Sequence, residues 1–367
     1  MTAAKKKNSR RKQARFRSSR RKRIRNTVLL LLLLVVLGGT GIGAIYVLRN
    51  GTVFDKLEEA YVASREFSGG ITDLDSLRAD GFAKNLCVVV SDVPMDGVSL
   101  GENQKGLLLD LDDRKVLYSK QALQKVYPAS ITKIMTAMLA LKYGNMNDVV
   151  TITQENLNLE EGSQVCGFWA GDQVTMDQLL HCLLVYSGND AAAAIAEHVG
   201  GSTEGFVEMM NSYARELGCT GTHFTNPHGL QDENHYTTPY DIYLMLKEAL
   251  NYPEFTQITQ SGSYTVEYTH ADGSSASTTL LATDHYLTGE ATPPKNVTIL
   301  GGKTGTTDNA GNCLALLSQN AYGKPYISIV MGASTKDELY EQMSTLLQNI
   351  NLIFDVLVSR FMNRSHN

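Results

Sequence analysis

The sequence predicts an α/β or α+β domain in which strands from both ends of the domain enclose a helical middle. Three observations predict it: an early hairpin pattern, central apolar residues at helical spacing, and three late apolar segments separated by Gly/Asn turns. We therefore expect one sheet to be built from both ends. With 43% hydrophobic and 19% charged residues, the chain of 367 residues can bury a core, which excludes a fully disordered protein.

The N-terminal tail differs in composition from the rest of the chain. Residues 1–26 hold 13 of the 33 Lys and Arg residues and no Asp or Glu, so the remainder carries a net charge of −18, against −5 for the whole chain. The acidic remainder argues against nucleic acid as a partner, because phosphate binding requires a basic face. The tail is better interpreted as a topology signal that contacts anionic lipid.

Residues 27–48 contain no charged side chain. A helix of that length spans the ~30 Å hydrocarbon layer of a membrane. The Lys/Arg excess before it predicts a single-pass signal anchor, with 1–26 in the cytoplasm and the rest outside. A cleaved signal peptide is the alternative, but its apolar region is usually ~7–15 residues long and ends in a small-x-small site, which 45–49 does not offer.

Two segments are expected outside the membrane. Residues 49–85 are polar and weakly patterned, which predicts an extracytoplasmic stalk, and 86–362 have the pattern of a folded domain. In that domain the apolar segments 107–110 and 116–118 flank the turn residues 112–114, which predicts a hairpin.

A helical region follows the hairpin. Residues 131–143 carry apolar side chains at helical spacing and stop at Gly144. The same pattern predicts three more helices, the first two separated by a polar break at 187–190; they are 176–185, 191–199 and 203–217.

The C-terminal third changes character. Strands are predicted at 297–300, 313–317 and 326–330, and a long amphipathic helix is predicted at 336–361.

Common metal and catalytic motifs are absent from the sequence. It contains no H-E-x-x-H, G-x-S-x-G or phosphate-binding G-x-x-x-x-G-K-[ST] pattern, and its five cysteines show no zinc-ligand spacing. We therefore predict neither a metal site nor a cofactor. Cys87 and Cys182 are interpreted as small buried hydrophobes. His228 and His235, in a polar loop, are expected at the surface or in hydrogen bonds.

A serine and a lysine stand three residues apart at the start of the helix predicted at 131–143. At that spacing the side chains of Ser130 and Lys133 share one face. A lysine amine can act as a base toward a hydroxyl if desolvation or a nearby positive charge lowers its pKa. The pattern S-x-x-K alone is weak, because Ser19 and Lys22 in the tail match it by chance.

Two further patterns complete a catalytic set. Ser187 and Asn189 lie at the break between two helices, where a hydroxyl can relay a proton and an amide can hold a substrate carbonyl. Lys303, Thr304 and Gly305 form the only K-T-G triplet of the chain. The lysine charge suits a substrate carboxylate, and the glycine lets a substrate backbone lie close to the strand.

The three patterns together are far more specific than any one of them. They occur in the order S-x-x-K, S-x-N and K-T-G, on a helix start, an inter-helix loop and a strand. This is the signature of the serine penicillin-recognising enzymes, which include penicillin-binding proteins and β-lactamases.

Longer segments around these patterns resemble one branch of that superfamily, the serine D-alanyl-D-alanine carboxypeptidases or low-molecular-mass penicillin-binding proteins. The resemblance is carried by 127–137, 187–192, 224–230, 301–307 and 310–311. It implies a β-lactamase/transpeptidase-like fold, in which an antiparallel sheet flanked by helices meets a helical subdomain and the active site lies between them. The substrates implied are peptidoglycan stem peptides ending in D-Ala-D-Ala, with β-lactams as covalent inhibitors.

The resemblance also implies a role for each motif residue. Ser130 would attack the peptide carbonyl while Lys133 takes its proton, and Ser187 with Lys303 would assist proton transfer to the leaving D-Ala. Asn189 would hold the substrate. The terminal carboxylate would be bound by Lys303, Thr304 and Thr306, and the oxyanion by the backbone N–H groups of Ser130 and Thr306.

Some features separate the chain from relatives. β-Lactamases of the nearest type carry a Glu in an E-x-x-L-N loop, and 226–230 contains no such residue, so we expect long-lived β-lactam adducts. Relatives often have an Arg where this chain offers Lys336. A D,D-transpeptidase or endopeptidase of the same fold, and a non-catalytic cell-wall sensor or scaffold, remain as alternatives.

Overall fold

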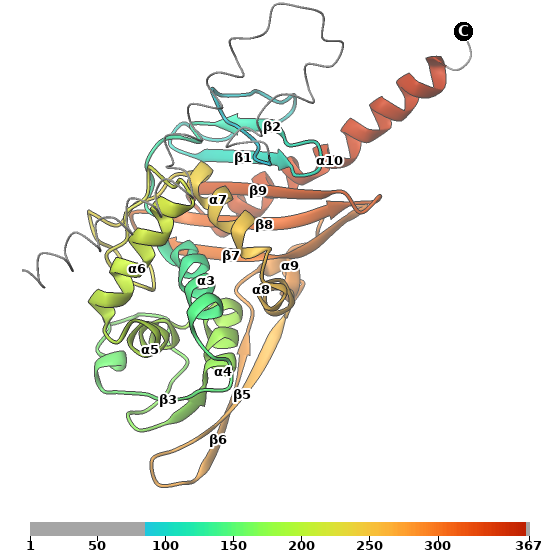
Figure 1. Cartoon of the computed structure of the whole chain (residues 1–367). Coiled ribbons are helices and arrows are strands. Elements are labelled where there is room, and N and C mark those ends of the chain that lie inside the picture. Colours follow the sequence, from blue (N-terminus) through green and yellow to red (C-terminus); the bar gives the residue numbers. More distant parts are fainter. Residues whose placement is uncertain (1–84, 365–367) are drawn as a thin grey trace, which may run out of the picture. The chain divides into compact units, whose positions relative to one another are not determined.

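The computed structural model describes residues 85–364 (Figure 1). The tail predicted at 1–26, the signal anchor at 27–48 and all but the last residue of the stalk at 49–85 lie outside these residues and stay predictions. Within 85–364, no helix combines the length and the apolar composition needed to cross a membrane.

The larger sheet joins the two ends of the described domain. Its five antiparallel strands are ordered β2-β1-β9-β8-β7. They are β1 (Lys105–Asp110), β2 (Lys115–Lys120), β7 (Val297–Thr307), β8 (Gly311–Asn320) and β9 (Pro325–Ala333). The first two form the predicted hairpin, and β1 pairs with β9, so that Gly106 lies opposite Val330. The prediction of one sheet built from both ends is confirmed.

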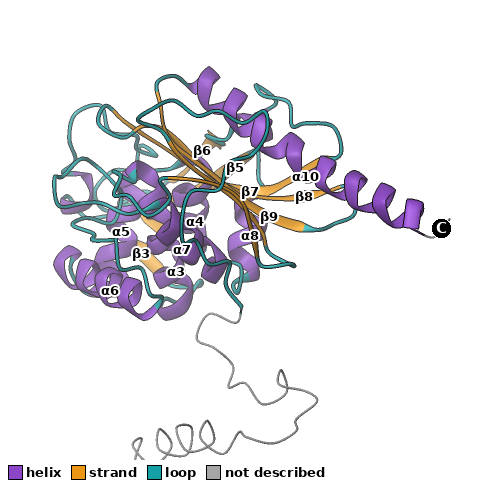
Figure 2. Ribbon diagram, turned by 90° about the horizontal axis from the view of Figure 1, so that it is seen from above, coloured by secondary structure: helices purple, strands orange, loops and turns teal. Residues whose placement is uncertain are grey.

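Successive apolar side chains of each strand point to opposite faces of this sheet. Both faces are therefore apolar and are covered by other elements. Leu107 and Leu109 of β1 belong to the core shared with the central helices, and Leu108 belongs to a second core on the opposite face. The second core is closed by α10 (Lys336–Arg364), which contributes Leu339 and Leu346 (Figure 2).

The helical part is built around α3. The 3₁₀ turn η1 (Ala129–Thr132) leads into α3 (Lys133–Tyr143), which ends at Gly144 as predicted, and its first eight residues are all buried. The helices packed nearby are α4 (Met176–His181), the π-helix η3 (Cys182–Tyr186), α5 (Asn189–Gly200) and α6 (Thr203–Glu216).

A second sheet was not predicted. It has the order β3-β4-β5-β6 and consists of Val149–Thr151, Gln173–Thr175, Ser263–Thr269 and Ser275–Leu281. Strands of three residues are too short to show a period, and the β5–β6 hairpin is largely exposed, so apolar alternation is weak there. The remaining helical segments are η2 (Glu155–Leu157), α7 (Pro239–Ala249), α8 (Pro253–Thr259) and α9 (His285–Thr288).

All five cysteines are buried and unbridged. Cys87 and Cys182, at 1% and 0% exposure, are the small buried side chains that their apolar surroundings predicted.

Candidate active site

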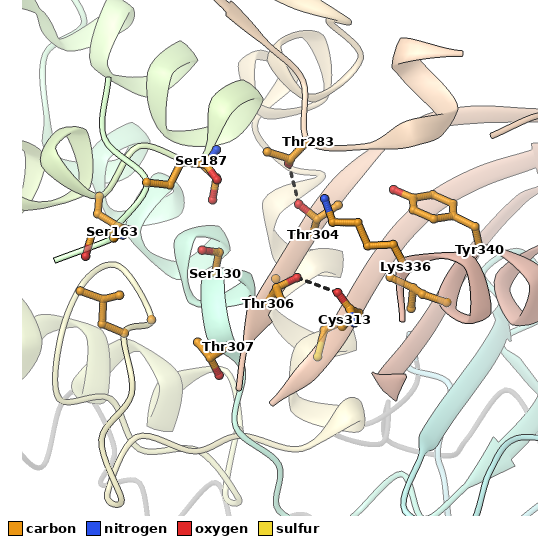
Figure 3. Close-up of a pocket in the computed structure, with 18 residues that line it drawn as sticks. Ser130, Ser163, Ser187, Thr283, Thr304, Thr306, Thr307, Cys313, Lys336 and Tyr340 are labelled. Carbon is orange, nitrogen blue, oxygen red and sulfur yellow. Dashed lines mark hydrogen bonds between the residues drawn. The ribbon is translucent and has the colours of Figure 1, made fainter. Parts of the chain in front are cut away.

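A cavity of about 330 Å³ lies between strand β7 and the helical part of the domain. Its walls come from η1, the loops at 162–164 and 229–230, the segment 187–189, the strands β7 and β8, and the start of α10. Ser130, Ser163 and Ser187 stand on one side, and Thr304, Thr306, Lys336 and Tyr340 stand on the other (Figure 3). The three sequence motifs therefore meet at one cavity.

Ser130 opens to the cavity, and Lys133 lies behind it. The Lys133 side chain is fully buried, and its Nζ donates to Ser130 Oγ at 2.9 Å. Nζ also donates to Asn189 Oδ1 at 2.6 Å and to the His228 carbonyl at 2.8 Å. Three acceptors thus fix the amine directly against the serine hydroxyl.

The surroundings of Lys133 disfavour its charged form. Burial and the positive charge of Lys303 hold the pKa of Lys133 well below its usual value. An amine that loses its proton more readily can accept one from the neighbouring hydroxyl, which activates Ser130 as a nucleophile.

Ser187 and Asn189 are placed by the junction between η3 and α5. Ser187 ends the π-helix in a left-handed conformation, with φ of 71°, which is uncommon for a residue with a side chain. The turn directs its hydroxyl to Lys303, whose Nζ donates to Ser187 Oγ at 2.9 Å. Ser130 and Ser187 are each therefore paired with a buried lysine.

Lys303, Thr304 and Thr306 all lie on β7, as predicted for the K-T-G segment. Lys303 is 1% exposed, and burial lowers its pKa to about 7. The Thr304 hydroxyl is hydrogen-bonded to that of Thr283 at 2.5 Å, and the Thr306 hydroxyl donates to Asn312 Oδ1 at 3.2 Å. Both hydroxyls line the cavity and are held in place by neighbours that the sequence did not single out.

The structure gives a second reason for a glycine at position 305, besides the close approach of a substrate backbone that the sequence suggested. A Cβ atom at this position would lie 3.0 Å from the Pro128 carbonyl oxygen and 3.0 Å from the Ser130 backbone nitrogen. The glycine therefore lets β7 pack directly against the turn that carries Ser130.

The two histidines of the polar loop require a correction. Their hydrogen bonding is confirmed, but a surface position is wrong for His235, which is 1% exposed. His235 is buried because the loop folds back onto η1, where its Nε2 lies 2.8 Å from Thr132 Oγ1. His228 is half-buried, and burial together with the charge of Lys133 lowers its pKa to about 3.

The roles of two polar residues, one in the cavity wall and one behind it, had no signal in the sequence. Asp190 is buried and accepts hydrogen bonds from the backbone N–H groups of Cys166 and Gly167, which fastens the 162–164 wall to α5. Ser163 in that wall has a buried hydroxyl with no partner within the described residues. Asp190 is the second residue of α5 and Ser163 lies in an irregular loop, and neither a period nor a motif marks these roles in the sequence. Residues 85–364 contain no cluster of three or more His, Cys, Asp or Glu side chains suited to a metal ion.

Comparison with known proteins shows the family to which the chain is related. Residues 101–335 match the family described as D-alanyl-D-alanine carboxypeptidase. The chain is 36% identical over 251 residues to D-alanyl-D-alanine carboxypeptidase DacF of Bacillus subtilis, covering 67% of this chain and 61% of DacF. It thus spans about three fifths of the length of that relative.

Solved structures show the same relationship. The DD-transpeptidase of Streptomyces K15 superposes with a TM-score of 0.62 at 27% identity, over 71% of this chain and 98% of that one. A D-alanyl-D-alanine carboxypeptidase of Mycobacterium tuberculosis superposes with a TM-score of 0.62 at 28% identity, over 71% and 95%. The described domain accordingly has the antiparallel α+β fold of the penicillin-recognising DD-peptidases, and the chain belongs to the D-alanyl-D-alanine carboxypeptidase family.

Proposed function

We propose that the chain is a serine D-alanyl-D-alanine carboxypeptidase that removes the terminal D-Ala from peptidoglycan stem peptides. The observation that carries this proposal is the buried amine of Lys133, 2.9 Å from a serine hydroxyl that opens into the cavity. Family membership supports the substrate class, because the matching family and relatives such as DacF of Bacillus subtilis are named for this activity.

The proposed reaction begins with attack by Ser130. Its Oγ forms a bond to the carbonyl carbon between the two D-Ala residues as its proton passes to the amine of Lys133. The oxyanion would be held by the backbone N–H groups of Ser130 and Thr306, two residues that line the cavity (Figure 3). Because β7 is an edge strand of its sheet, its free edge offers backbone groups to an extended peptide.

The second half of the reaction releases the two products. A proton reaches the leaving amine of D-Ala through Ser187, whose hydroxyl is 2.9 Å from the Lys303 amine. The carbon–nitrogen bond breaks and leaves an ester on Ser130. Water then cleaves the ester and restores the serine.

The terminal carboxylate of the substrate would be held at the opposite wall. Thr304 and Thr306 line the cavity there, and the Lys303 amine donates to the Thr304 carbonyl at 2.9 Å. Lys336 stands at the start of α10 on the same wall and would add a second positive charge (Figure 3).

The same arrangement supports a role as a penicillin target. The loop at 226–230 faces Lys133 with the carbonyl of His228 and carries no carboxylate that could activate a deacylating water. We therefore expect penicillin to acylate Ser130 and to leave slowly.

For the chain as a whole, we propose a single-pass membrane protein of bacteria with a cytoplasmic N-terminus and an extracytoplasmic catalytic domain. The support is the sequence pattern of a basic tail followed by 22 uncharged residues.

The function is tested with the full-length chain in detergent, supplied with a peptide ending in D-Ala-D-Ala. Free D-Ala should appear with the wild type and be absent with Ser130→Ala of the same folded content. Transfer of the peptide to an added amino acid in place of water would favour the D,D-transpeptidase alternative. A folded wild type that releases no D-Ala and binds no fluorescent penicillin would contradict an enzymatic function and favour a cell-wall sensor or scaffold.

A further inference from the structure

His235 is a buried imidazole with no part in the proposed reaction. Its Nδ1 accepts the backbone N–H of Thr225 at 3.1 Å, and its Nε2 lies 2.8 Å from Thr132 Oγ1. A backbone N–H can only donate, so Nδ1 is unprotonated and Nε2 carries the hydrogen donated to the Thr132 hydroxyl. The Thr225 N–H thus requires the neutral ring with its hydrogen on Nε2, and the Thr132 hydroxyl accepts that hydrogen.

The two partners of this ring belong to segments that meet at Lys133. Thr132 immediately precedes Lys133 in the chain. Thr225 begins the loop whose His228 carbonyl accepts a hydrogen bond from Lys133 Nζ at 2.8 Å. Within this loop, the Asn226 side chain accepts from Gly229 N at 2.7 Å and donates to the Leu230 carbonyl at 3.1 Å.

The loop and the nucleophile turn are also packed without free space. Gly229 has φ of +90°, and a Cβ there would lie 1.9 Å from the Ala129 carbonyl oxygen. Thr136 of α3 donates to the Pro227 carbonyl at 2.5 Å. A small displacement of the loop would therefore move the carbonyl that faces the Lys133 amine.

We propose that His235 is a positioning residue for Lys133, whose neutral imidazole ties the 225–230 loop to η1 and holds the His228 carbonyl at the amine. His235 acts through Thr132 and Thr225 and does not reach the cavity lining. Its effect on catalysis rests on the function proposed above, whereas its effect on the loop does not.

Protonation of His235 would undo this tie, because an Nδ1–H would face the N–H of Thr225. Burial lowers the pKa of His235 to about 4; the charges of His223 and Lys133 act in the same direction, and Asp232 acts against them. His228, which is half-buried and has a pKa lowered to about 3, lies in the same loop. The pKa of His235 in the folded protein is below the ~6.5 of a histidine in the unfolded chain. As the pH falls, the unfolded chain therefore takes up the proton before the folded protein does. The stability that the neutral ring contributes is complete above about pH 6.5 and is lost as the pH falls to about 4.

Two substitutions distinguish the contribution of the two hydrogen bonds from that of the imidazole ring itself. In His235→Gln, the amide can accept from Thr225 and donate to Thr132 without titrating, whereas His235→Ala retains neither bond. His223→Ala is the control, since this neighbouring histidine is exposed and bonds only to the Asn234 carbonyl through its side chain.

The first measurement is hydrogen exchange of the full-length protein, followed by mass spectrometry of peptides covering 225–230. Exchange in His235→Ala should be at least about tenfold faster than in the wild type, and His235→Gln and His223→Ala should match the wild type. The dependence of urea stability on pH between about 6.5 and 4 should be shallower in His235→Gln, which lacks the titrating ring.

The second measurement is the rate at which fluorescent penicillin acylates Ser130 at pH 7. We expect a loss of about 10- to 100-fold in His235→Ala, with recovery to within about threefold in His235→Gln. If His235→Ala does not fold, Thr132→Val, which keeps the volume and removes the acceptor, gives the same comparison. Unchanged exchange in His235→Ala, or a Gln variant as impaired as the Ala variant, would overturn the proposal. A wild type that penicillin does not acylate would contradict the proposed function, while the exchange data would still decide the role of His235.

Discussion

At the scale of single residues, the proposed reaction sets opposite charge requirements on two buried lysines. In that reaction Lys133 must be neutral to accept the proton of Ser130, and Lys303 must be a cation to attract the substrate carboxylate. Burial lowers the pKa of both amines, that of Lys303 to about 7. The enzyme should therefore work best between the two ionisations.

This conflict predicts a bell-shaped dependence of kcat/KM on pH. The rate constant should fall above about pH 7 as Lys303 loses its proton, and below the optimum as Lys133 gains one. Release of D-Ala measured from pH 5 to 10 gives the profile. The arginine of Lys303→Arg stays charged throughout this range. In this variant kcat/KM should be lower at every pH, but its fall near pH 7 should disappear. The same fall in the variant would show that another group controls the alkaline limb.

The motif residues could be predicted from the sequence because their identities and order are local and specific. Ser130, Ser187 and Lys303 lie far apart in the chain, yet each motif marks its own position. His235 and Asp190 could not be assigned in this way. Their roles arise only from loops that fold back onto η1 and α5, and a loop sequence has no period that shows this.

At the scale of elements, the packing of β7 against η1 positions the nucleophile. Gly305 permits this contact, since a Cβ would meet the backbone of Pro128 and Ser130 at 3.0 Å. Gly305→Ala should therefore slow acylation by penicillin by at least about tenfold and lower stability by about 1–3 kcal/mol, the usual cost of overpacking. Acylation kinetics and urea unfolding measure the two effects.

A second position in the same strand provides the control. Thr298 is exposed on β7 away from η1, so Thr298→Ala should leave both quantities close to those of the wild type. Equal acylation rates in Gly305→Ala and the wild type would contradict the claim that this contact positions Ser130.

The helices and strands could be predicted where the segment was long enough to show a hydrophobic period. The β1–β2 hairpin, α3, and the long amphipathic helix α10 all have clear patterns. The helix expected at 176–185 is α-helical only to His181 and continues as a π-helix that turns at Ser187. Hydrophobic spacing does not distinguish these two forms over five residues.

At the scale of the whole domain, the active site depends on a sheet covered on both faces. Leu346 of α10 is fully buried in the core opposite the catalytic helices. Leu346→Ala should cost about 2–5 kcal/mol of stability, because it leaves a cavity in that core. Since the core lies on the face away from α3, the penicillin acylation rate of the folded variant should stay within about twofold.

Urea unfolding and acylation of the same preparations test this separation. Gln348→Ala, at an exposed position of the same helix, should change neither quantity. A loss of acylation in Leu346→Ala that matches its loss in Gly305→Ala would show that the two faces are not independent.

In the proposed reaction, Ser130 forms the covalent intermediate. Peptide mapping by mass spectrometry of the penicillin-treated, full-length protein tests it directly. We predict a single adduct on the peptide that contains Ser130, absent from Ser130→Ala and present, though formed more slowly, in Ser187→Ala. An adduct on another residue such as Ser163 or Ser187, or an adduct that persists in Ser130→Ala, would contradict it.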